Sequence, residues 1–272
     1  MPLCLTLLTD YGPETGFVGA LHTVAFNIAP DAHVIDLDHS LPPGNVRLGA
    51  LRLERFARLL PVGAHVGVVD PGVGGTRRPI AIAAGNHYLV GPDNGLLIWA
   101  AERLGGIDRV VLLDDPRYHL GKRSRTFDGR DIFVPVAAHL LSGTRLEEVG
   151  SPIAPDHLKR LERPVAITSR DGSLFVEVLQ VDGFGNVQFG ANADDVARLG
   201  LREGDRVMIA LADGGPAVAA IYGATFGDVP RGETVMLLDS DGQLALSVNG
   251  GRADAVFDEP QGTFARISRA PG

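Results

Sequence analysis

Two short polar segments carry the residue types that chemistry needs, and we expect them to meet in space. Asp70 ends an apolar run, a turn rich in glycine follows it, and Arg77 comes seven residues later. The second segment, residues 126–131, reads Thr-Phe-Asp-Gly-Arg-Asp and includes Asp128 ahead of an apolar helix. Neighbouring carboxylates and guanidinium groups shift one another's pKa, and shifted groups are common in acid–base catalysis. These segments therefore predict a reactive site.

Asp10 follows the first apolar run, where a buried strand should end. In a parallel sheet the carboxyl ends of strands line the ligand crevice, so this carboxylate could bind a ribose hydroxyl or an amine. The alternative is an Asx-turn or a helix cap. Asn94 lies in a comparable turn, Gly-Pro-Asp-Asn-Gly over residues 91–95. That turn either simply reverses the chain or opens a helix whose backbone N–H groups point at a ligand.

Other kinds of site are poorly supported by the spacing. The glycines of residues 72–75 lack the Lys-Ser or Lys-Thr of a Walker loop and the spacing of a dinucleotide-binding loop, which favours a tight turn. The 8 histidines include no HExxH or HxxxH spacing, so we predict no metal site. No GxSxG elbow is present, which argues against a Ser-His-Asp hydrolase.

The composition is that of a folded globular protein with an ample core. The chain has 272 residues, of which 45% are hydrophobic and 21% charged, and this length favours two domains. A net charge of −8 argues against general nucleic-acid binding, which needs clustered Lys and Arg. The locally basic stretch 117–125 could equally be a solvated face. We expect no nucleic-acid partner.

The cysteine and hydropathy patterns indicate a cytoplasmic protein. The single cysteine, Cys4, excludes an intramolecular disulfide and any CxxC metal site, and its apolar surroundings predict a buried, inert thiol. The first apolar run lacks a positive flank and is soon broken by Asp10, so it makes a poor signal peptide. No stretch approaches the roughly 18 to 20 apolar residues that span a bilayer. We therefore expect no membrane association.

The N-terminal part, residues 1–150, alternates apolar runs with helical patterns. Short apolar strands separated by helices imply βαβ units and an α/β domain with a mostly parallel sheet. The predicted strands are Leu3–Leu8, His33–Leu37, Ala64–Val69, Ile80–Ala84 and Arg109–Leu113. The predicted helices are Gly16–Ile28, Val46–Leu60, Gly95–Arg103 and Ile132–Leu141, with Asn45 as a cap of the second.

The pattern changes in the C-terminal part. Residues 151–164 contain three prolines and mixed charges, which suits a linker. Residues 165–272 show short alternating strands joined by the tight-turn dipeptides Asp171-Gly172, Asp213-Gly214 and Asp241-Gly242. The predicted strands are Leu174–Val181, Arg206–Leu211, Val218–Tyr222, Thr234–Leu238, Gln243–Val248 and Thr263–Ser268. This pattern predicts a small all-β domain, a sandwich or a barrel.

A family resemblance covers nearly the whole chain. It rests on the order and spacing of several motifs: Leu-Thr-Asp10-Tyr-Gly, Asp36-Leu-Asp-His39, Val-Asp70-Pro-Gly-Val-Gly, Gly91-Pro-Asp-Asn-Gly, Thr126-Phe-Asp-Gly-Arg-Asp, Asp182-Gly-Phe-Gly-Asn186, Phe226-Gly-Asp-Val-Pro and Val248-Asn-Gly-Gly. The chain resembles the S-adenosylmethionine hydroxide adenosyltransferases, relatives of the fluorinases and chlorinases. The resemblance implies an N-terminal α/β domain, a C-terminal β-barrel and a homotrimer with active sites between subunits.

The resemblance also implies a reaction. In that family water or hydroxide attacks C5′ of the ribose of S-adenosylmethionine, which yields adenosine and methionine without a cofactor. The hydrolases use an Asp-Arg-His set, in which Asp70 and Arg77 match and the histidine position falls on Asp128. Either Asp128 accepts a proton or positions water in place of histidine, or the set is broken and the protein binds adenosyl compounds with little turnover. We favour hydrolysis.

Halide chemistry is the weaker alternative. Fluorinase-like relatives carry a hydroxyl-bearing residue where this chain has Gly129, and that hydroxyl helps to desolvate fluoride. Gly129 lacks the donor, and the adjacent Asp128 would repel an anion.

The remaining carried-over residues concern substrate binding. The resemblance assigns ribose hydroxyls to Asp10, adenine to Asn186, and the methionine part to Asp182 and Ser240. Val248 and Gly250 would approach adenine through their backbones, and Phe226 would pack on the purine unless it is ordinary core. Asn94 and Phe127 complete the expected substrate-binding set. Three departures, Thr15 for Asp, Asp241 for Arg and Ala245 for Glu, concern the methionine end of the pocket more than the adenosine end.

Overall fold

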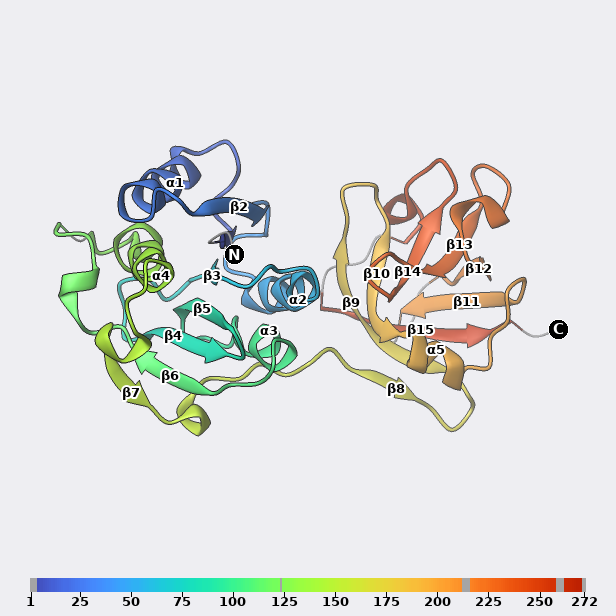
Figure 1. Cartoon of the computed structure of the whole chain (residues 1–272). Coiled ribbons are helices and arrows are strands. Elements are labelled where there is room, and N and C mark those ends of the chain that lie inside the picture. Colours follow the sequence, from blue (N-terminus) through green and yellow to red (C-terminus); the bar gives the residue numbers. More distant parts are fainter. Residues whose placement is uncertain (1–3, 123, 212–215, 258–261, 271–272) are drawn as a thin grey trace. The chain divides into compact units, whose positions relative to one another are not determined.

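The computed structural model describes residues 4–122, 124–211, 216–257 and 262–270. The chain divides into two compact units, residues 1–161 and 162–272 (Figure 1). The segment expected to be a linker carries a short strand, β7 (Ser151–Ile153), which pairs with β6 (Arg109–Leu112) of the first unit. Most of residues 151–164 therefore belongs to the first unit.

The first unit is built on a seven-stranded mixed sheet with the order β2-β1-β3-β5-β4-β6-β7. Its remaining strands are β1 (Cys4–Thr9), β2 (His33–Asp38), β3 (Ala64–Val68), β4 (Pro79–Ala84) and β5 (His87–Pro92). The β1–β2, β1–β3 and β3–β5 pairs are parallel, whereas β4 is antiparallel to both of its neighbours. β6 consequently runs with the parallel group, and the prediction of mostly parallel strands is confirmed.

Helices cover both faces of this sheet (Figure 1). α1 (Gly16–Ile28) and α4 (Val134–Leu141) pack on one face, in a core that includes Leu5 and Leu7 of β1. α2 (Val46–Ala57) and α3 (Ile98–Arg103) pack against each other on the opposite face. Gly67 of β3 admits Leu53 and Leu97 there, since a Cβ atom at Gly67 would lie 3.3 and 3.1 Å from their methyl groups.

The strand order creates a topological switch point of the kind at which α/β proteins bind ligands. From β1 the chain moves to β2 on one side and then to β3 on the other, so the connections diverge between β1 and β3. Ligands bind outside the carboxyl ends of parallel strands at such a switch point. Asp10 directly follows β1, and Asp70 follows β3 by two residues. The fold thus brings both carboxylates to this switch point.

The second unit is a closed barrel of seven strands in the order β10-β14-β13-β12-β11-β15-β9, with β9 pairing back to β10. The short strand β8 (Ala166–Thr168) extends the sheet beside β9. The strands of the ring are β9 (Leu174–Val181), β10 (Val187–Asn192), β11 (Arg206–Leu211), β12 (Val218–Tyr222), β13 (Thr234–Leu238), β14 (Gln243–Val248) and β15 (Phe264–Arg269). Helix α5 (Ala193–Arg198) follows β10. The predicted all-β, barrel-like domain is confirmed.

Single helical turns complete both units. They are the 3-10 turns η1 (Pro116–Tyr118), η3 (Leu146–Glu148), η4 (Pro155–His157), η5 (Phe226–Asp228) and η6 (Ala253–Ala255), and the π-helical turn η2 (Gly129–Phe133), which leads directly into α4.

Most predicted elements are present, several with their predicted bounds. The helix predicted over Gly95–Arg103 begins only at Ile98, because the Asn94 side chain accepts a hydrogen bond from Leu96 N and holds the preceding residues in a turn. The helix expected to run to Leu60 ends at Ala57. β5, β7, β8, β10 and α5 were not predicted. The Asp213-Gly214 turn lies outside the described residues.

The expected burial of Cys4 is confirmed. Among the described helices, none combines the length and the apolar character needed to cross a membrane.

Candidate functional site

The two polar segments of the first unit meet through Arg77. Its Nε donates to Asp70 Oδ2 over 2.8 Å, and its Nη2 lies 2.7 Å from the same oxygen. The same Nη2 also donates to Asp128 Oδ2 in a very short contact. The three side chains are 8, 5 and 2% exposed for Arg77, Asp70 and Asp128, so the ion pairs are buried. The structure therefore joins the three residues predicted to be reactive.

Backbone geometry explains why segments so distant in sequence can meet. Asp70 O accepts from Val73 N over 3.2 Å, which closes the turn after β3. Gly74, with φ of 75°, lies so close to the other segment that a Cβ atom would be 2.4 Å from Arg125 O. Only glycine fits such an approach without displacement. The preference for a tight turn over a phosphate loop agrees with this geometry.

Asp70 keeps one carboxylate oxygen available. Its Oδ2 is engaged by Arg77, whereas Oδ1 is buried and has no hydrogen-bond partner among the described residues. A buried carboxylate oxygen without a partner is costly in free energy, so it marks a place where a ligand or water is expected to donate a proton. Arg77 holds the rest of the carboxylate in place by a bond through its Nε and contact through Nη2.

Charges at the site favour a cation. Asp70 and Asp128 face one guanidinium, so this cluster carries one net negative charge, and Asp10 follows the neighbouring strand β1. Burial lowers the pKa of the Arg77 guanidinium, but its hydrogen bonds to Asp70 and Asp128 outweigh burial and raise that pKa above its ordinary value. Arg77 therefore stays charged. Within the described residues, no group of three or more His, Cys, Asp or Glu side chains is arranged so that it could hold a metal ion.

Asp10 is held after β1 by hydrogen bonds with backbone groups. Its Oδ2 accepts from Gly44 N over 2.8 Å, and its own N–H donates to Val68 O over 3.3 Å. The carboxylate thus has one turn-like hydrogen bond, as the structural alternative expects, and also lies where a ribose-binding group was expected. The two roles are compatible, because a carboxylate has capacity for several donors.

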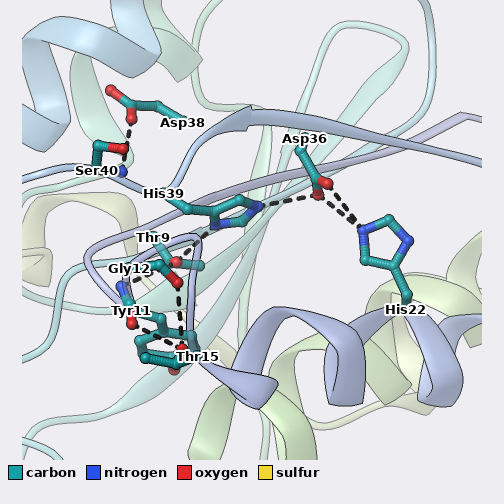
Figure 2. A network of polar contacts seen from close by, with 9 residues as sticks. All are labelled: Thr9, Tyr11, Gly12, Thr15, His22, Asp36, Asp38, His39 and Ser40. Carbon is teal, nitrogen blue, oxygen red and sulfur yellow. Dashed lines mark hydrogen bonds and ion pairs between the residues drawn. The ribbon is translucent and has the colours of Figure 1, made fainter.

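A polar network fixes the turn that follows Asp10 (Figure 2). Asp36 of β2 accepts from His22 at 2.9 Å and lies 3.0 Å from Nε2 of His39. Nδ1 of His39 lies 2.8 Å from Oγ1 of Thr9, and that oxygen accepts from Tyr11 N over 3.2 Å. Burial raises the pKa of Asp36, but its contacts with His39 and His22 outweigh burial and lower that pKa.

The same turn is tied a second time by its backbone. Gly12 N donates to His39 O over 2.9 Å, and Thr15 Oγ1 donates to Tyr11 O over 3.0 Å (Figure 2). His39 is 8% exposed and therefore belongs to the interior of this network. His22, Asp36 and His39 thus support the segment that carries Asp10 and Tyr11.

An aromatic cluster lies beside the ion pairs. The rings of Tyr11, Phe17 and Phe127 contact one another edge to face, with centroids 5.1 to 5.9 Å apart. The Arg130 guanidinium lies 4.8 Å from the centroid of Phe127. Phe17 is half exposed, whereas Phe127 is adjacent in sequence to Asp128. Phe127, predicted to bind substrate, is thus close to the ion-paired carboxylates.

Asn94 supports the site through backbone contacts. Its Nδ2 donates to Val69 O over 2.8 Å, and its Oδ1 accepts from Leu96 N over 3.1 Å. These bonds connect the end of β5 to the residue that precedes Asp70. Asn94 therefore helps to position Asp70, whichever role it has toward a ligand.

The second unit carries the other residues expected to bind substrate. Asp182 organises the loop between β9 and β10: its Oδ1 accepts from Phe184 N and Asn186 N, and its Oδ2 accepts from Asn186 Nδ2 over 2.8 Å. Phe184, at the tip, is 82% exposed. Asp182 and Asn186 are therefore brought together, and Asn186 is oriented by the carboxylate.

Four further residues lie around the same barrel. Phe226 begins η5 and is 48% exposed, so it is not ordinary core. Ser240 is exposed in the turn between β13 and β14, and Val248 ends β14. Gly250 follows in the left-handed region with φ of 68°. The first unit thus contains the Asp70–Arg77–Asp128 site, and the second unit contains a separate group of residues that are expected to bind substrate.

The fold and these residues define a two-domain protein with an α/β unit, in which acidic residues follow neighbouring parallel strands, and a β-barrel. Residues 5–150 match the SAM hydroxide adenosyltransferase N-terminal domain, and residues 176–263 match the C-terminal domain of the same family. The chain belongs to the SAM hydroxide adenosyltransferase family.

Individual relatives agree with this assignment. A protein of Salinispora arenicola named (R)-S-adenosyl-L-methionine hydrolase is 44% identical over 266 residues, which is 97% of each chain. A fluorinase of Actinopolyspora mzabensis is 24% identical, over 98% of this chain and 97% of its own length. An uncharacterized conserved protein from Thermotoga maritima has a solved structure with a TM-score of 0.89 at 34% identity, covering 97% of this chain and 100% of its own.

Sequence reasoning missed two residues that shape the site. Tyr11 directly follows Asp10 in the sequence, and this adjacency could have identified it as a residue near the site. His39 was noted only as part of the motif Asp36-Leu-Asp-His39 and was given no role, because its contact with Thr9 spans 30 residues of sequence and leaves no periodic pattern.

Proposed function

We propose that this protein hydrolyses S-adenosylmethionine to adenosine and methionine by attack of water on the ribose C5′. The observation that carries the proposal is the partnerless Oδ1 of Asp70 beside Arg77, in a chain whose relative at 44% identity is named an (R)-S-adenosyl-L-methionine hydrolase. That name also makes the (R) epimer the first substrate to test.

The site can supply what the reaction requires. As the water oxygen forms a bond to C5′, the bond from C5′ to sulfur breaks and its electron pair leaves with methionine as a neutral thioether. One water proton passes to Asp70 Oδ1 and then to solvent, so one proton is released per turnover. Arg77 fixes the carboxylate so that its acceptor oxygen stays aimed at the water, and such orientation accounts for much of enzymatic rate acceleration. No cofactor is needed in this scheme.

Charge favours hydrolysis over halogenation. The net negative charge of the Asp70–Arg77–Asp128 cluster attracts a sulfonium cation. One unbalanced negative charge about 4 Å from a halide would oppose its binding by about 4 kcal/mol at the effective dielectric of a protein site. Gly129 also lacks a hydroxyl to replace the hydration of the halide.

A second candidate function is binding of adenosyl compounds with little turnover. It is motivated by Asp128, which occupies the position expected for histidine. Asp128 nevertheless contacts Arg77 directly, so the arrangement of three charged groups is intact. We therefore favour turnover.

The proposal extends to assembly and location. We propose a homotrimer whose active sites form between subunits, with the α/β site and the barrel candidates each supplying part. The exposed aromatics Phe184 and Phe226 suit such burial, since exposed aromatic side chains are typical of interaction surfaces. A cytoplasmic location is proposed from the lone buried cysteine and from the substrate.

The test is an incubation of the purified protein with each sulfonium epimer of S-adenosylmethionine in water labelled with heavy oxygen. We expect adenosine that carries the label on its 5′ oxygen, together with unlabelled methionine, as read by chromatography and mass spectrometry. Added fluoride or chloride should yield no 5′-halogenated nucleoside. Binding by calorimetry without adenosine above background would refute hydrolysis and support the binding protein.

A further inference from the structure

Tyr11 presents a hydroxyl to the reactive cluster that the proposed mechanism has not used. An ideal Cβ atom at Gly129 would lie 2.4 Å from this phenolic oxygen, so the oxygen lies against the residue that follows Asp128. No described residue forms a hydrogen bond with it. A phenol whose ring is largely enclosed ordinarily finds a partner for its O–H. The hydroxyl of Tyr11 is thus available to a ligand or water.

The ring of Tyr11 is held firmly. Its backbone N–H and carbonyl are engaged by Thr9 and Thr15, and its ring packs edge to face on Phe17 and Phe127. The network around His39 supports this turn from β2 (Figure 2). A hydroxyl at the end of a fixed ring can orient a small molecule, because little conformational entropy is lost when it does so.

The electrostatic setting keeps the hydroxyl protonated. Burial, followed by the charges of Asp10, Asp70 and Asp128, raises the pKa of Tyr11, and Arg77 only partly opposes them. Tyr11 is therefore a donor throughout the working pH range. The charge of Asp70 is among those that act on the Tyr11 hydroxyl, and Asp70 Oδ1 also has no hydrogen-bond partner among the described residues.

We propose that Tyr11 is a positioning residue for the attacking water, whose oxygen accepts from the Tyr11 hydroxyl while one of its protons points to Asp70 Oδ1. The inference rests on the proposed function. Two polar groups that do not bond each other directly are commonly bridged by one water. With one lone pair held by Tyr11 and one proton held by Asp70, the second lone pair of the water is directed at C5′.

The test compares Tyr11→Phe with wild type, and with Tyr118→Phe as a matched control that removes a phenol elsewhere in the same unit. Tyr11→Phe keeps the ring contacts, so we expect kcat to fall about tenfold to a hundredfold. The KM for S-adenosylmethionine and the affinity for adenosine should stay within about twofold. A purely structural role would change binding and thermal unfolding together with kcat.

A second variant, which keeps Tyr11 itself, tests the proposal even if Tyr11→Phe does not fold. Gly129→Ala places a methyl group against the Tyr11 oxygen and must push it aside, so kcat should fall here too. The inference is overturned if Tyr11→Phe or Gly129→Ala retains wild-type kcat, or if Tyr118→Phe loses as much. Absence of adenosine from the wild type would instead refute the proposed function, so the two failures are distinguishable.

Discussion

Asp70 and Asp93 follow neighbouring parallel strands and bind consecutive arginines, but they differ in the use of one oxygen. Asp93 Oδ2 accepts from Arg78 Nη2 over 2.5 Å, and its Oδ1 accepts from Lys159 N over 2.9 Å. Asp70 binds Arg77 in a similar way through Oδ2, yet its Oδ1 is buried without a partner among the described residues. Both carboxylate oxygens of Asp93 are therefore used in structural contacts, whereas Asp70 keeps Oδ1 as a hydrogen-bond acceptor for a reacting water.

This contrast predicts opposite effects of the same substitution. Asp70→Asn should lower kcat about a hundredfold or more, because the amide cannot take the proton released by the attacking water. Asp93→Asn should leave kcat near the wild-type value but reduce the free energy of unfolding by about 1 to 3 kcal/mol, since it weakens buried hydrogen bonds. Adenosine formation and urea unfolding measured on both variants check this. Equal kcat losses would contradict the assignment.

Asp128 permits a test of the departure that the family resemblance implies. If Asp128 does the work that histidine does in relatives, Asp128→His should form adenosine within about tenfold of the wild-type rate. The pH profile of the variant should gain a transition near neutrality, where an imidazole titrates. Asp128→Asn, which keeps the shape but removes the charge, should raise KM for the cationic substrate. A gain above a hundredfold in Asp128→His would instead indicate that the natural chain is a weak hydrolase.

Gly129 should not support halogenation after a single substitution. A Cβ atom at this position would lie 2.4 Å from Tyr11 Oη, so Gly129→Ser must first displace Tyr11. We expect at least a tenfold loss of hydrolysis and no 5′-halogenated nucleoside in fluoride or chloride. Combining Gly129→Ser with Tyr11→Phe should cost less than the two separate losses together, because both act on one contact. Strict additivity of the two effects would show that the residues act independently.

The sequence predicted the features that depend on residues near one another in the chain. The strands and the carboxylates that follow them were predictable, because apolar periodicity locates a strand and Asp10 or Asp70 comes just after it. The pairing of Arg77 with Asp128 was expected from motif content. The backbone contact that makes this pairing possible was not predicted. Gly74 approaches Arg125 O across 51 residues of sequence, and no local propensity encodes such a contact.

The unpredicted parts are those whose role depends on distant partners. Gly91 and Pro92 were predicted to belong to a turn over residues 91–95, but pairing with β3 and β4 makes them the end of β5. Asn94 looked like a ligand-facing residue, whereas its amide holds backbone groups at two strand ends. In each case tertiary contacts override the local signal.

A histidine pair, of which His65 is fully buried, should make the stability of the first unit depend on pH. His65 is fully buried, with Nδ1 3.0 Å from Thr6 Oγ1 and Nε2 2.9 Å from His87 Nδ1. Burial, assisted by His87, lowers the pKa of His65 from 6.5 to about 3, and burial also lowers the pKa of His87. Both imidazoles are therefore neutral in the folded protein under ordinary conditions.

The sign of the effect follows from proton binding. Above pH 6.5 the His65 imidazole is neutral in the folded and the unfolded chain, so it contributes no pH dependence to the free energy of unfolding. Below pH 6.5 the imidazole of the unfolded chain binds a proton, whereas that of the folded chain binds one only near pH 3. The free energy of unfolding should therefore fall as the pH falls, by about 2 kcal/mol between about pH 6.5 and pH 5 for His65 alone. Urea unfolding at a series of pH values measures this slope. His65→Asn should flatten it even if the variant is less stable, whereas His33→Asn, at an exposed residue of β2, should retain it. If the slopes of His65→Asn and wild type coincide, the low pKa of His65 is wrong.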